Sequence, residues 1–318
     1  MMNISEYLKS TIQLSLKHQI DPTQMALAEE MRSSYRAMIP SAGTPDPVKD
    51  VQNILIPATE PARQIPARLY KPLGADYSQK LPMIIFIHGG GFVSGDLDTH
   101  DVLVRAMCNG AQAIVLSVDY RLAPEFPFPA ALEDVYIALQ WMLEQADELG
   151  GDIGRVAVAG DSAGGTLAAA LPMLVRDINE FKFSAQWLIY PETSHKMDTE
   201  SWHLFGATNF PTKPVNTAVL KAYTVNVTNP YHPLIAPLWG NHENLPPALL
   251  QVGEYDPLRD ENILYADALT KAGVDAEVVV YPQQMHGFIQ FYKDKANNSR
   301  GEDALTLGLA FLNRYLNP

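Results

Sequence analysis

The chain has 318 residues, 47% of them hydrophobic, which is enough to bury the core of one large domain with insertions. Its 36 acidic and 23 basic side chains give a formal net charge of -13, which disfavours nucleic acid and anionic membrane surfaces as partners. The N-terminus lacks the unbroken apolar stretch of a signal peptide, and no run is long enough to span a bilayer. Because Cys108 is the only cysteine, no internal disulfide can form, and we expect a cytoplasmic protein.

Residues 1–48 precede the first strand and have helical spacing. Leu8, Ile12 and Leu16 recur every four residues, which is typical of one face of a helix. A second helical run covers residues 22–38 and stops at a proline. The sequence therefore predicts two helices before the sheet.

Short β-like runs follow these helices. Two of them between residues 51 and 70, VQNILI and ARLY, are separated by polar and proline-containing sequence, which is typical of an antiparallel sheet edge. Six apolar runs bounded by turn residues come next, and such runs favour strands buried on both faces. They occupy residues 83–87, 114–118, 156–160, 185–190, 248–253 and 276–281.

Helical stretches lie between these runs, most clearly at residues 131–148. One apolar stripe follows that stretch and consists of Leu132, Val135, Leu139, Met142 and Ala146. The alternation of strands and helices predicts an α/β fold with a mostly parallel central sheet and helices on both faces. We assign residues 49–190 and 247–318 to this core.

The stretch 191–246 interrupts the alternation and is predicted to be an insertion after a strand. Together with residues 1–48, it is positioned to fold over the carboxyl ends of the strands, where open α/β sheets bind ligands. We therefore expect the two segments to form a helical cap.

Residues 160–164, Gly-Asp-Ser-Ala-Gly, match the G-x-S-x-G pattern between an apolar strand and an alanine-rich helical run that begins near residue 165. A serine on such a sharp turn has a strained backbone, so the residues two positions away must be small, as Gly160 and Gly164 are. The following helix directs its N-terminal N–H groups toward negative charge that develops there. An ordinary serine in a glycine-rich turn is the alternative, but the flanking elements favour Ser162 as a nucleophile.

Residues 88–92, His-Gly-Gly-Gly-Phe, directly follow the strand at 83–87. Glycines leave backbone N–H groups exposed and let a ligand approach closely. Such a run after a strand is by itself only a loop signal. In combination with residues 160–164, in this order, it is typical of an oxyanion hole.

A serine nucleophile needs a base, and the base needs a carboxylate that orients it. In this type of site the chain order is serine, acid, histidine. Asp256 and His286 each follow a predicted strand, so both are expected near Ser162. An ordinary loop histidine and a helix N-cap are the alternative interpretations of these two residues. Glu254 and Asp260 compete with Asp256 for the role of the acid.

Five motifs carry a more specific signal. They are H-G-G-G-F at 88–92, D-Y-R-L-A-P-E at 119–125, G-D-S-A-G-G at 160–165, D-P-L-R-D at 256–260 and H-G-F at 286–288. Together they resemble the hormone-sensitive-lipase-like family of α/β-hydrolase esterases. The resemblance covers the chain from about residue 88 to residue 288, and the two segments of the expected cap contain no matching motif.

The resemblance implies a role for each site residue. Ser162 is expected to be the nucleophile, Asp256 the orienting acid and His286 the base. The backbone N–H groups that match the family's oxyanion hole are those of Gly90, Gly91 and Ala163. The resemblance further implies that small, uncharged carboxylic esters with short to medium acyl chains are cleaved through an acyl-enzyme, without a cofactor or a metal. A homodimer is also expected, and the β-rich run at 276–281, near a possible sheet edge, agrees with it.

Two other functions stay open. A non-catalytic ligand-binding or protein-binding module on the same fold is expected to lack a triad residue, and all three are present. An amidase or lactonase shares the machinery and differs only in the leaving group. Three aromatic residues of the insertion either line an acyl pocket or pack in the core, namely Trp202, Phe205 and Phe210.

Four polar residues, Asp96, Asp98, His100 and Asp101, have the composition of a metal cluster. A loop that leads into a helix, with Asp98 or Thr99 as its N-cap, explains them more simply. We therefore expect no metal there.

Overall fold

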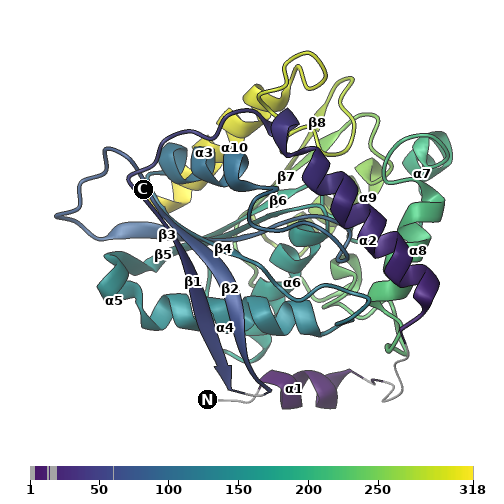
Figure 1. The fold of residues 1–318 in the computed structure, drawn as a ribbon, viewed down its shortest axis with the longest axis horizontal. Helices are drawn as coiled ribbons and strands as arrows, with labels where there is room; N and C mark the ends of the chain where they lie inside the picture. The colour runs from purple at the N-terminus through teal and green to yellow at the C-terminus, as the bar shows by residue number, and fades with distance from the viewer. Residues whose placement is uncertain (1–3, 13, 15–19, 60, 318) are drawn as a thin grey trace.

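The computed structural model describes residues 4–12, 14, 20–59 and 61–317. Its centre is an eight-stranded sheet in the order β1-β2-β4-β3-β5-β6-β7-β8 (Figure 1). The strands are β1 (Asp50–Thr59), β2 (Ala62–Lys71), β3 (Leu81–Ile87), β4 (Ile114–Val118), β5 (Gly151–Asp161), β6 (Ala185–Ile189), β7 (Ala248–Gly253) and β8 (Ala276–Tyr281). Each predicted strand is present, with boundaries that shift by a few residues.

The sheet is antiparallel at one edge and parallel elsewhere. Strand β1 pairs with β2, and β2 with β4, in antiparallel register. All other neighbours are parallel. The predictions of an antiparallel edge and of a mostly parallel sheet are therefore both confirmed.

The central strands of the sheet are more deeply buried than its last strand, β8. Strands β3, β4, β6 and β7 are buried at every residue. Strand β8 is only partly buried, so the prediction of a strand buried on both faces is wrong for residues 276–281. The physical reason is its place at the end of the sheet, where it has a neighbouring strand on one side only.

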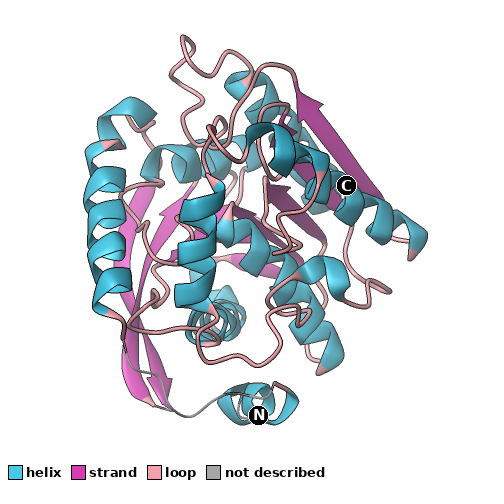
Figure 2. Ribbon diagram, turned by 90° about the vertical axis from the view of Figure 1, so that its right-hand side faces the viewer, coloured by secondary structure: helices cyan, strands magenta, loops and turns pink. Residues whose placement is uncertain are grey.

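Helices cover both faces of the sheet (Figure 2). One hydrophobic cluster joins the sheet to α3 and α10, and a second joins it to α4, α6 and α9 on the other face. The helices are α1 (Ile4–Thr11), α2 (Pro22–Ala37), α3 (Asp101–Ala111), α4 (Ala130–Glu144), α5 (Ala146–Leu149), α6 (Ala163–Asp177), α7 (Glu200–Phe205), α8 (Lys213–Tyr223), α9 (Arg259–Lys271) and α10 (Gly301–Leu316), with 3₁₀ turns η1 (Ile39–Ala42) and η2 (Pro237–Trp239).

The predicted helix at 131–148 is two helices, α4 and α5. The chain leaves the helical conformation at Gln145, whose ψ is 2°. The predicted apolar stripe is nevertheless buried along both helices. At the N-terminus, Leu8 is buried in α1 as the helical spacing predicts. Ile12 is also buried but follows the end of the helix at Thr11, and Leu16 lies outside the described residues.

Helices α2 and α8 come from the two segments outside the predicted core and pack against each other (Figure 1). Helix α2 also faces the turn that follows β5, because Met31 and Ser34 line the same cavity as Ser162. In the part of the chain that the structure describes, no helix has both the length and the apolar character needed to cross a membrane.

Candidate active site

Ser162 lies in the turn between β5 and α6, where its backbone has a φ of 54° and a ψ of -122°. A non-glycine residue rarely adopts a positive φ, so this turn holds the serine in a strained conformation. A Cβ atom on Gly160 would collide with the backbone of Gly164, and one on Gly164 would collide with the backbone of Ile87 and His88. Both positions therefore require glycine, as the motif predicts.

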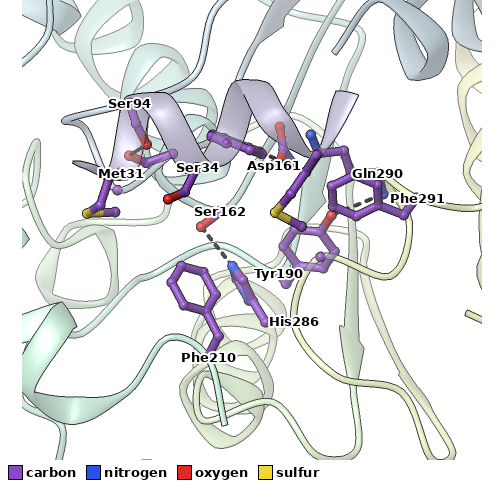
Figure 3. Close-up of a pocket in the computed structure, with 15 residues that line it drawn as sticks. Met31, Ser34, Ser94, Asp161, Ser162, Tyr190, Phe210, His286, Gln290 and Phe291 are labelled. Atoms are coloured by element: carbon purple, nitrogen blue, oxygen red, sulfur yellow. Dashed lines mark hydrogen bonds between the residues drawn. The ribbon is translucent and has the colours of Figure 1, made fainter. Parts of the chain in front are cut away.

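The structure brings Ser162, His286 and Asp256 into one hydrogen-bonded chain (Figure 3). His286 Nε2 lies 2.9 Å from Ser162 Oγ, and His286 Nδ1 lies 2.7 Å from Asp256 Oδ2. The Asp256 side chain is fully buried, and that of His286 is 4% exposed. The serine, the imidazole and the carboxylate thus have the contacts that a nucleophile, a base and an orienting acid require.

The two competing carboxylates have other partners. Glu254 accepts a hydrogen bond from the backbone N–H of Gln283 at 2.9 Å. Asp260 accepts one from the backbone N–H of Ser201 at 2.7 Å. Asp256 is therefore the acid that the geometry favours over its neighbours.

The glycine loop after β3 presents free backbone donors beside Ser162. Gly90 and Gly91 have φ values of 127° and 62°, and a Cβ atom on Gly90 would collide with the backbone of Ser94. Ala163 is the first residue of α6, where N–H groups have no partner within the helix. No described residue accepts a hydrogen bond from the N–H groups of Gly90, Gly91 or Ala163. These donors are available to an oxyanion.

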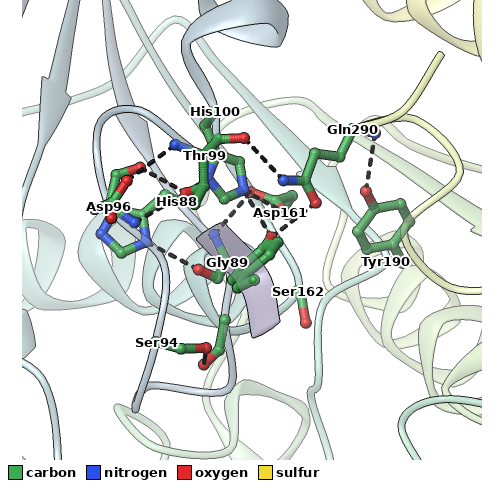
Figure 4. A network of polar contacts seen from close by, with 12 residues as sticks. His88, Gly89, Ser94, Asp96, Thr99, His100, Asp161, Ser162, Tyr190 and Gln290 are labelled. Atoms are coloured by element: carbon green, nitrogen blue, oxygen red, sulfur yellow. Dashed lines mark hydrogen bonds and ion pairs between the residues drawn. The ribbon is translucent and has the colours of Figure 1, made fainter. Parts of the chain in front are cut away.

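A buried polar network lies behind the glycine loop (Figure 4). Asp161 Oδ1 accepts a hydrogen bond from the backbone N–H of Gly89 at 2.8 Å, and His100 Nε2 lies 3.1 Å from the same carboxylate. Tyr35 Oη on α2 lies 3.2 Å from His100 Nε2 and donates to Gln290 Oε1 at 2.7 Å. The network joins the glycine loop to α2 and to the loop that carries the base.

The protonation of Asp161 follows from these contacts. Burial alone would raise the pKa of the Asp161 carboxyl, but His100, the N–H of Gly89 and His88 outweigh it and hold this pKa below its ordinary value. Asp161 therefore stays ionised and accepts the hydrogen bond that fixes the Gly89 peptide.

The acidic residues beside this network are engaged by arginines. Asp96 pairs with Arg36, and both Asp98 and Asp101 pair with Arg68. Among the described residues, no group of three or more His, Cys, Asp or Glu side chains could hold a metal ion.

The prediction that Asp98 or Thr99 is the N-cap residue of α3 is wrong. The helix begins at Asp101, and the residue before it is His100, which makes no side-chain capping bond. Thr99 Oγ1 instead accepts from the backbone N–H of Asp96, and Asp96 Oδ1 accepts from the backbone N–H of Thr99. Asp96 and Thr99 thus stabilise the turn before the helix and not the helix itself. His100, at the N-cap position, is buried beside Asp161.

A mainly apolar cavity of about 410 Å³ opens above Ser162. Met31 and Ser34 of α2 lie across it from Phe210 and His286 (Figure 3). It is lined by Met31, Ser34, Tyr35, Met38, Gly90, Gly91, Ser94, Asp161, Ser162, Tyr190, Phe210, His286, Gly287, Gln290 and Phe291.

The three aromatic residues of the insertion have different roles. Phe210 lines the cavity, and its ring centroid lies 5.9 Å from that of His286. Trp202 is 2% exposed and donates its indole N–H to Glu261 in the interior. Phe205 packs against Tyr255.

Sequence reasoning missed the cavity residues Met31, Tyr35 and Met38. They come from the N-terminal segment, which contains no motif, and only the helical spacing of residues 22–38 hints at a face that packs on the core. Nothing in that spacing indicates which element this face contacts.

A comparison with family models agrees with the site. The model described as alpha/beta hydrolase fold matches residues 84–290, which include the glycine loop, the serine turn, the acid and the histidine. The chain belongs to the hormone-sensitive-lipase-like family of esterases. Its sheet and helices form an α/β-hydrolase fold.

Several esterases of this family are similar to the chain over most of its length. A carboxylic ester hydrolase of Mycobacterium tuberculosis, LipN, is 41% identical over 288 residues, which are 87% of this chain and 74% of that protein. An ethyl acetate hydrolase of Pseudomonas putida is 34% identical over 275 residues, which are 85% of this chain and 85% of that protein. The crystal structure of EstE1, a thermostable carboxylesterase from a metagenomic library, has a TM-score of 0.85 at 37% identity, covering 93% of this chain and 98% of that one.

Proposed function

We propose that this protein is a serine carboxylesterase that hydrolyses small, uncharged esters through an acyl-enzyme on Ser162. Its family makes it a carboxylic ester hydrolase, and the proposal adds the residues and the substrate class. The observation that carries it is the hydrogen-bonded chain from Asp256 through His286 to Ser162, at the floor of an apolar cavity.

In the proposed mechanism, Ser162 Oγ attacks the ester carbonyl carbon while His286 Nε2 takes the hydroxyl proton. The oxyanion accepts hydrogen bonds from the N–H groups of Gly90, Gly91 and Ala163. His286 then gives the proton to the leaving alcohol. Water, activated by the same imidazole, cleaves the acyl-enzyme, and the ionised Asp256 accepts the Nδ1–H bond that keeps the imidazole in its reactive tautomer.

The cavity and the charge of the chain support uncharged substrates. Its lining is mainly apolar, so a charged group would lose hydration on entering it. The net charge of -13 also repels anions. One relative is named as an ethyl acetate hydrolase, which agrees with acyl chains of short to medium length.

The most direct test is a panel of p-nitrophenyl esters, from acetate upward, assayed with the wild type and with Ser162→Ala. We expect turnover by the wild type and its loss in the variant. A sulfonyl fluoride should label Ser162 stoichiometrically, because only an activated serine reacts quickly with it. Labelling of another serine contradicts the assignment, and absence of turnover on every ester favours the non-catalytic binding module.

Amide and lactone substrates belong in the same assay, because the triad and the oxyanion donors serve them equally. A higher kcat/KM for an amide or a lactone than for every ester would replace the esterase proposal. Turnover that survives a metal chelator is also expected, since no step of the mechanism uses an ion.

We also propose that residues 1–48 and 191–246 form the cap over the site. The contact between α2 and α8 and the presence of Met31 and Phe210 in the cavity support this division. Because Cys108 is the only cysteine and is buried, the chain depends on no internal disulfide, which supports a cytoplasmic location.

A homodimer is proposed through β8, the end strand of the sheet. The unpaired edge of such a strand is a template for pairing with a second copy, and a two-fold axis would join two β8 strands in antiparallel register. Sedimentation at micromolar concentration should give the mass of a dimer. A monomer contradicts this proposal and leaves the esterase mechanism untouched.

A further inference from the structure

Two cavities of very different size meet at Ser162. The larger one, of about 410 Å³, contains His286 and Phe291. The second is a recess of about 20 Å³. Four residues line both cavities, namely Met31, Gly91, Ser162 and Phe210, so both reach the proposed nucleophile.

The chemistry of ester cleavage assigns one side of the substrate to each cavity. The leaving alcohol takes its proton from His286 Nε2, so the alcohol lies on the side of the imidazole. Among the two, only the larger cavity is lined by His286. The acyl group remains on Ser162 and extends away from the imidazole, into the recess beside Ala163.

The recess is bounded by apolar side chains and by one carboxyl group. The apolar lining includes Pro211, Val215, Val219 and Leu258, and the carboxyl group is that of Glu192. A volume of about 20 Å³ is little more than the space of one water molecule, about 10–15 Å³ on this measure. The recess therefore has the size of a small group such as methyl, and it is too small for a longer alkyl chain in this conformation.

Glu192 is held in this boundary by hydrogen bonds from two helices, α6 and α8. It is 4% exposed, and its Oε1 accepts a hydrogen bond from Asn216 Nδ2 on α8 at 2.6 Å. Its backbone carbonyl accepts from Thr166 Oγ1 on α6 at 2.7 Å. Side chain and main chain are thus fixed from opposite sides.

The second carboxyl oxygen of Glu192 adds a chemical restriction to the steric one. No described residue donates a hydrogen bond to Oε2. An alkyl chain that extended to the carboxyl group would leave this oxygen against hydrocarbon, which costs free energy. An acetyl group adds only one methyl group to the carbonyl carbon and is the acyl group that extends least into the recess.

We infer that Glu192 is a specificity-determining residue that closes the acyl recess and restricts the enzyme to esters of acetate and similarly short acids. The inference rests on the proposed esterase function and concerns only the acyl side. The alcohol side, facing the larger cavity, tolerates bulky apolar and aromatic groups.

The test compares kcat/KM for p-nitrophenyl acetate, butyrate and hexanoate in the wild type, Glu192→Ala and Glu192→Gln. The wild type should prefer acetate. Glu192→Ala removes the carboxyl group and the methylene that bears it, and should raise the butyrate-to-acetate ratio at least about tenfold, as one or two accommodated methylenes allow. Glu192→Gln keeps the shape of the side chain and should keep the wild-type order.

The matched control is Met38→Ala, which enlarges the larger cavity and not the recess. It should change the preference among acetate esters of different alcohols and leave the butyrate-to-acetate ratio within about twofold. If Glu192→Ala does not fold, Glu192→Asp withdraws the carboxyl group by one methylene and should raise the propionate-to-acetate ratio.

Two results overturn the inference. One is a wild type that prefers hexanoate over acetate. The other is a folded Glu192→Ala or Glu192→Asp variant with unchanged acyl preference. Failure of the esterase function itself is distinguishable, because the wild type would then cleave none of the esters and Ser162 would not react with a sulfonyl fluoride.

Discussion

At the scale of single residues, Asp256 forms one hydrogen bond to the His286 imidazole and a second one within its own loop. Its Oδ2 lies 2.7 Å from His286 Nδ1, and its Oδ1 accepts the backbone N–H of Leu258 at 2.9 Å. The carboxylate is thus held in one orientation by the start of the helical segment that follows it. The N-cap residue of α9 is Leu258, and no side chain caps the helix, so the alternative interpretation of Asp256 as a helix N-cap is wrong.

Asp256→Asn should therefore keep the fold and lose catalysis. An amide presents a donor or a single acceptor to His286, so the imidazole adopts the wrong tautomer and kcat falls by up to about 10⁴-fold, with little change in substrate binding. Steady-state kinetics with p-nitrophenyl acetate measure the loss. Circular dichroism checks that the fold is retained.

Glu254→Gln and Asp260→Asn are the matched controls for this substitution. Both carboxylates accept backbone hydrogen bonds. The amides keep an acceptor oxygen but lose the charge that strengthens these bonds, so each substitution should lower the free energy of unfolding, measured in urea, by about 0.5–2 kcal/mol, with kcat close to that of the wild type. If one of them abolished kcat while Asp256→Asn did not, the acid would have to be reassigned.

Asp161 offers a second prediction, as a positioning residue for the oxyanion loop. Asp161→Ala removes the acceptor of the Gly89 N–H and leaves His100 buried without its anion. The loop should loosen, and kcat should fall by about 10²–10³-fold, the loss associated with one oxyanion donor. Asp161→Asn retains the Oδ1 acceptor and should restore part of kcat, with KM similar in all three proteins.

A merely structural role of Asp161 predicts a different result. In that case both variants would lower the melting temperature in proportion to their loss of activity. Kinetics measured at several temperatures below the unfolding transition separate the two explanations.

The sequence predicted the triad and missed this network for a physical reason. Ser162, Asp256 and His286 stand in short motifs that follow strands, so their neighbours along the chain report their environment. Tyr35, His100 and Gln290 meet Asp161 only through tertiary packing, and no local pattern reports such contacts.

At the scale of elements, Arg32 links α2 to the core through four hydrogen bonds. Arg32 pairs with both carboxylate oxygens of Glu125 at 2.7 Å and also donates to the carbonyls of Val93 and Ala123. Bidentate geometry of this kind fixes orientation as well as distance. Met31, which lines the cavity above Ser162, directly precedes Arg32. The contact between Arg32 and Glu125 therefore also positions this part of the cavity lining.

Arg32→Ala should therefore weaken substrate binding more than chemistry. We expect KM to rise about two- to fivefold, the change that corresponds to a partly exposed ion pair of up to ~1 kcal/mol, while kcat stays nearly constant. Limited proteolysis should cleave faster near α2, since the helix separates more often from the core.

Arg36→Ala is the control for this prediction, because the Arg36 side chain is 62% exposed and pairs with Asp96 at the surface. It should change neither KM nor the cleavage rate measurably. Equal effects of the two substitutions would mean that α2 is held by its net charge and not by the bidentate contact.

The elements themselves were predictable where burial is uniform. Unbroken apolar runs identified β3, β4, β6 and β7, since a strand buried on both faces can tolerate few polar residues. The division between α4 and α5 was not predictable, because the apolar stripe continues through Gln145 although the helix does not.

At the scale of the whole molecule, the parallel sheet explains how distant residues form one site. Ser162, Asp256 and His286 follow the carboxyl ends of β5, β7 and β8, which lie at one edge of the sheet. The order of strands was not predictable from the sequence, and neither was the contact between α2 and α8, because both depend on pairings between segments far apart in the chain.

The interior also holds titratable groups that make stability depend on pH. Burial, and next the neighbouring Glu261 carboxyl, raise the pKa of Glu192 above its ordinary value of 4.5. Burial lowers the pKa of His88 and of His195 to about 4. The native state therefore favours the neutral form of both kinds of group.

The last prediction follows from Glu192. Between pH 4.5 and its raised native pKa, the unfolded chain has released the proton that the native protein still binds, so the free energy of unfolding falls as pH rises through this window and levels off above it. The slope is at most about 1.4 kcal/mol per pH unit for one group. Glu192→Gln does not titrate, so its unfolding free energy should fall less than that of the wild type between about pH 5 and about pH 8.

Urea unfolding at several pH values measures this difference, with the exposed Glu243→Gln as control. His88 and His195 act in the opposite direction, because their lowered pKa makes the free energy of unfolding fall as pH drops below 6.5. Both histidines are present in the wild type and in each variant, so their contribution cancels when the two unfolding free energies are subtracted. Equal slopes for the wild type and Glu192→Gln would mean that Glu192 is already ionised in the native state. The carboxyl group that bounds the acyl recess would then be an anion with Asn216 as its hydrogen-bond donor.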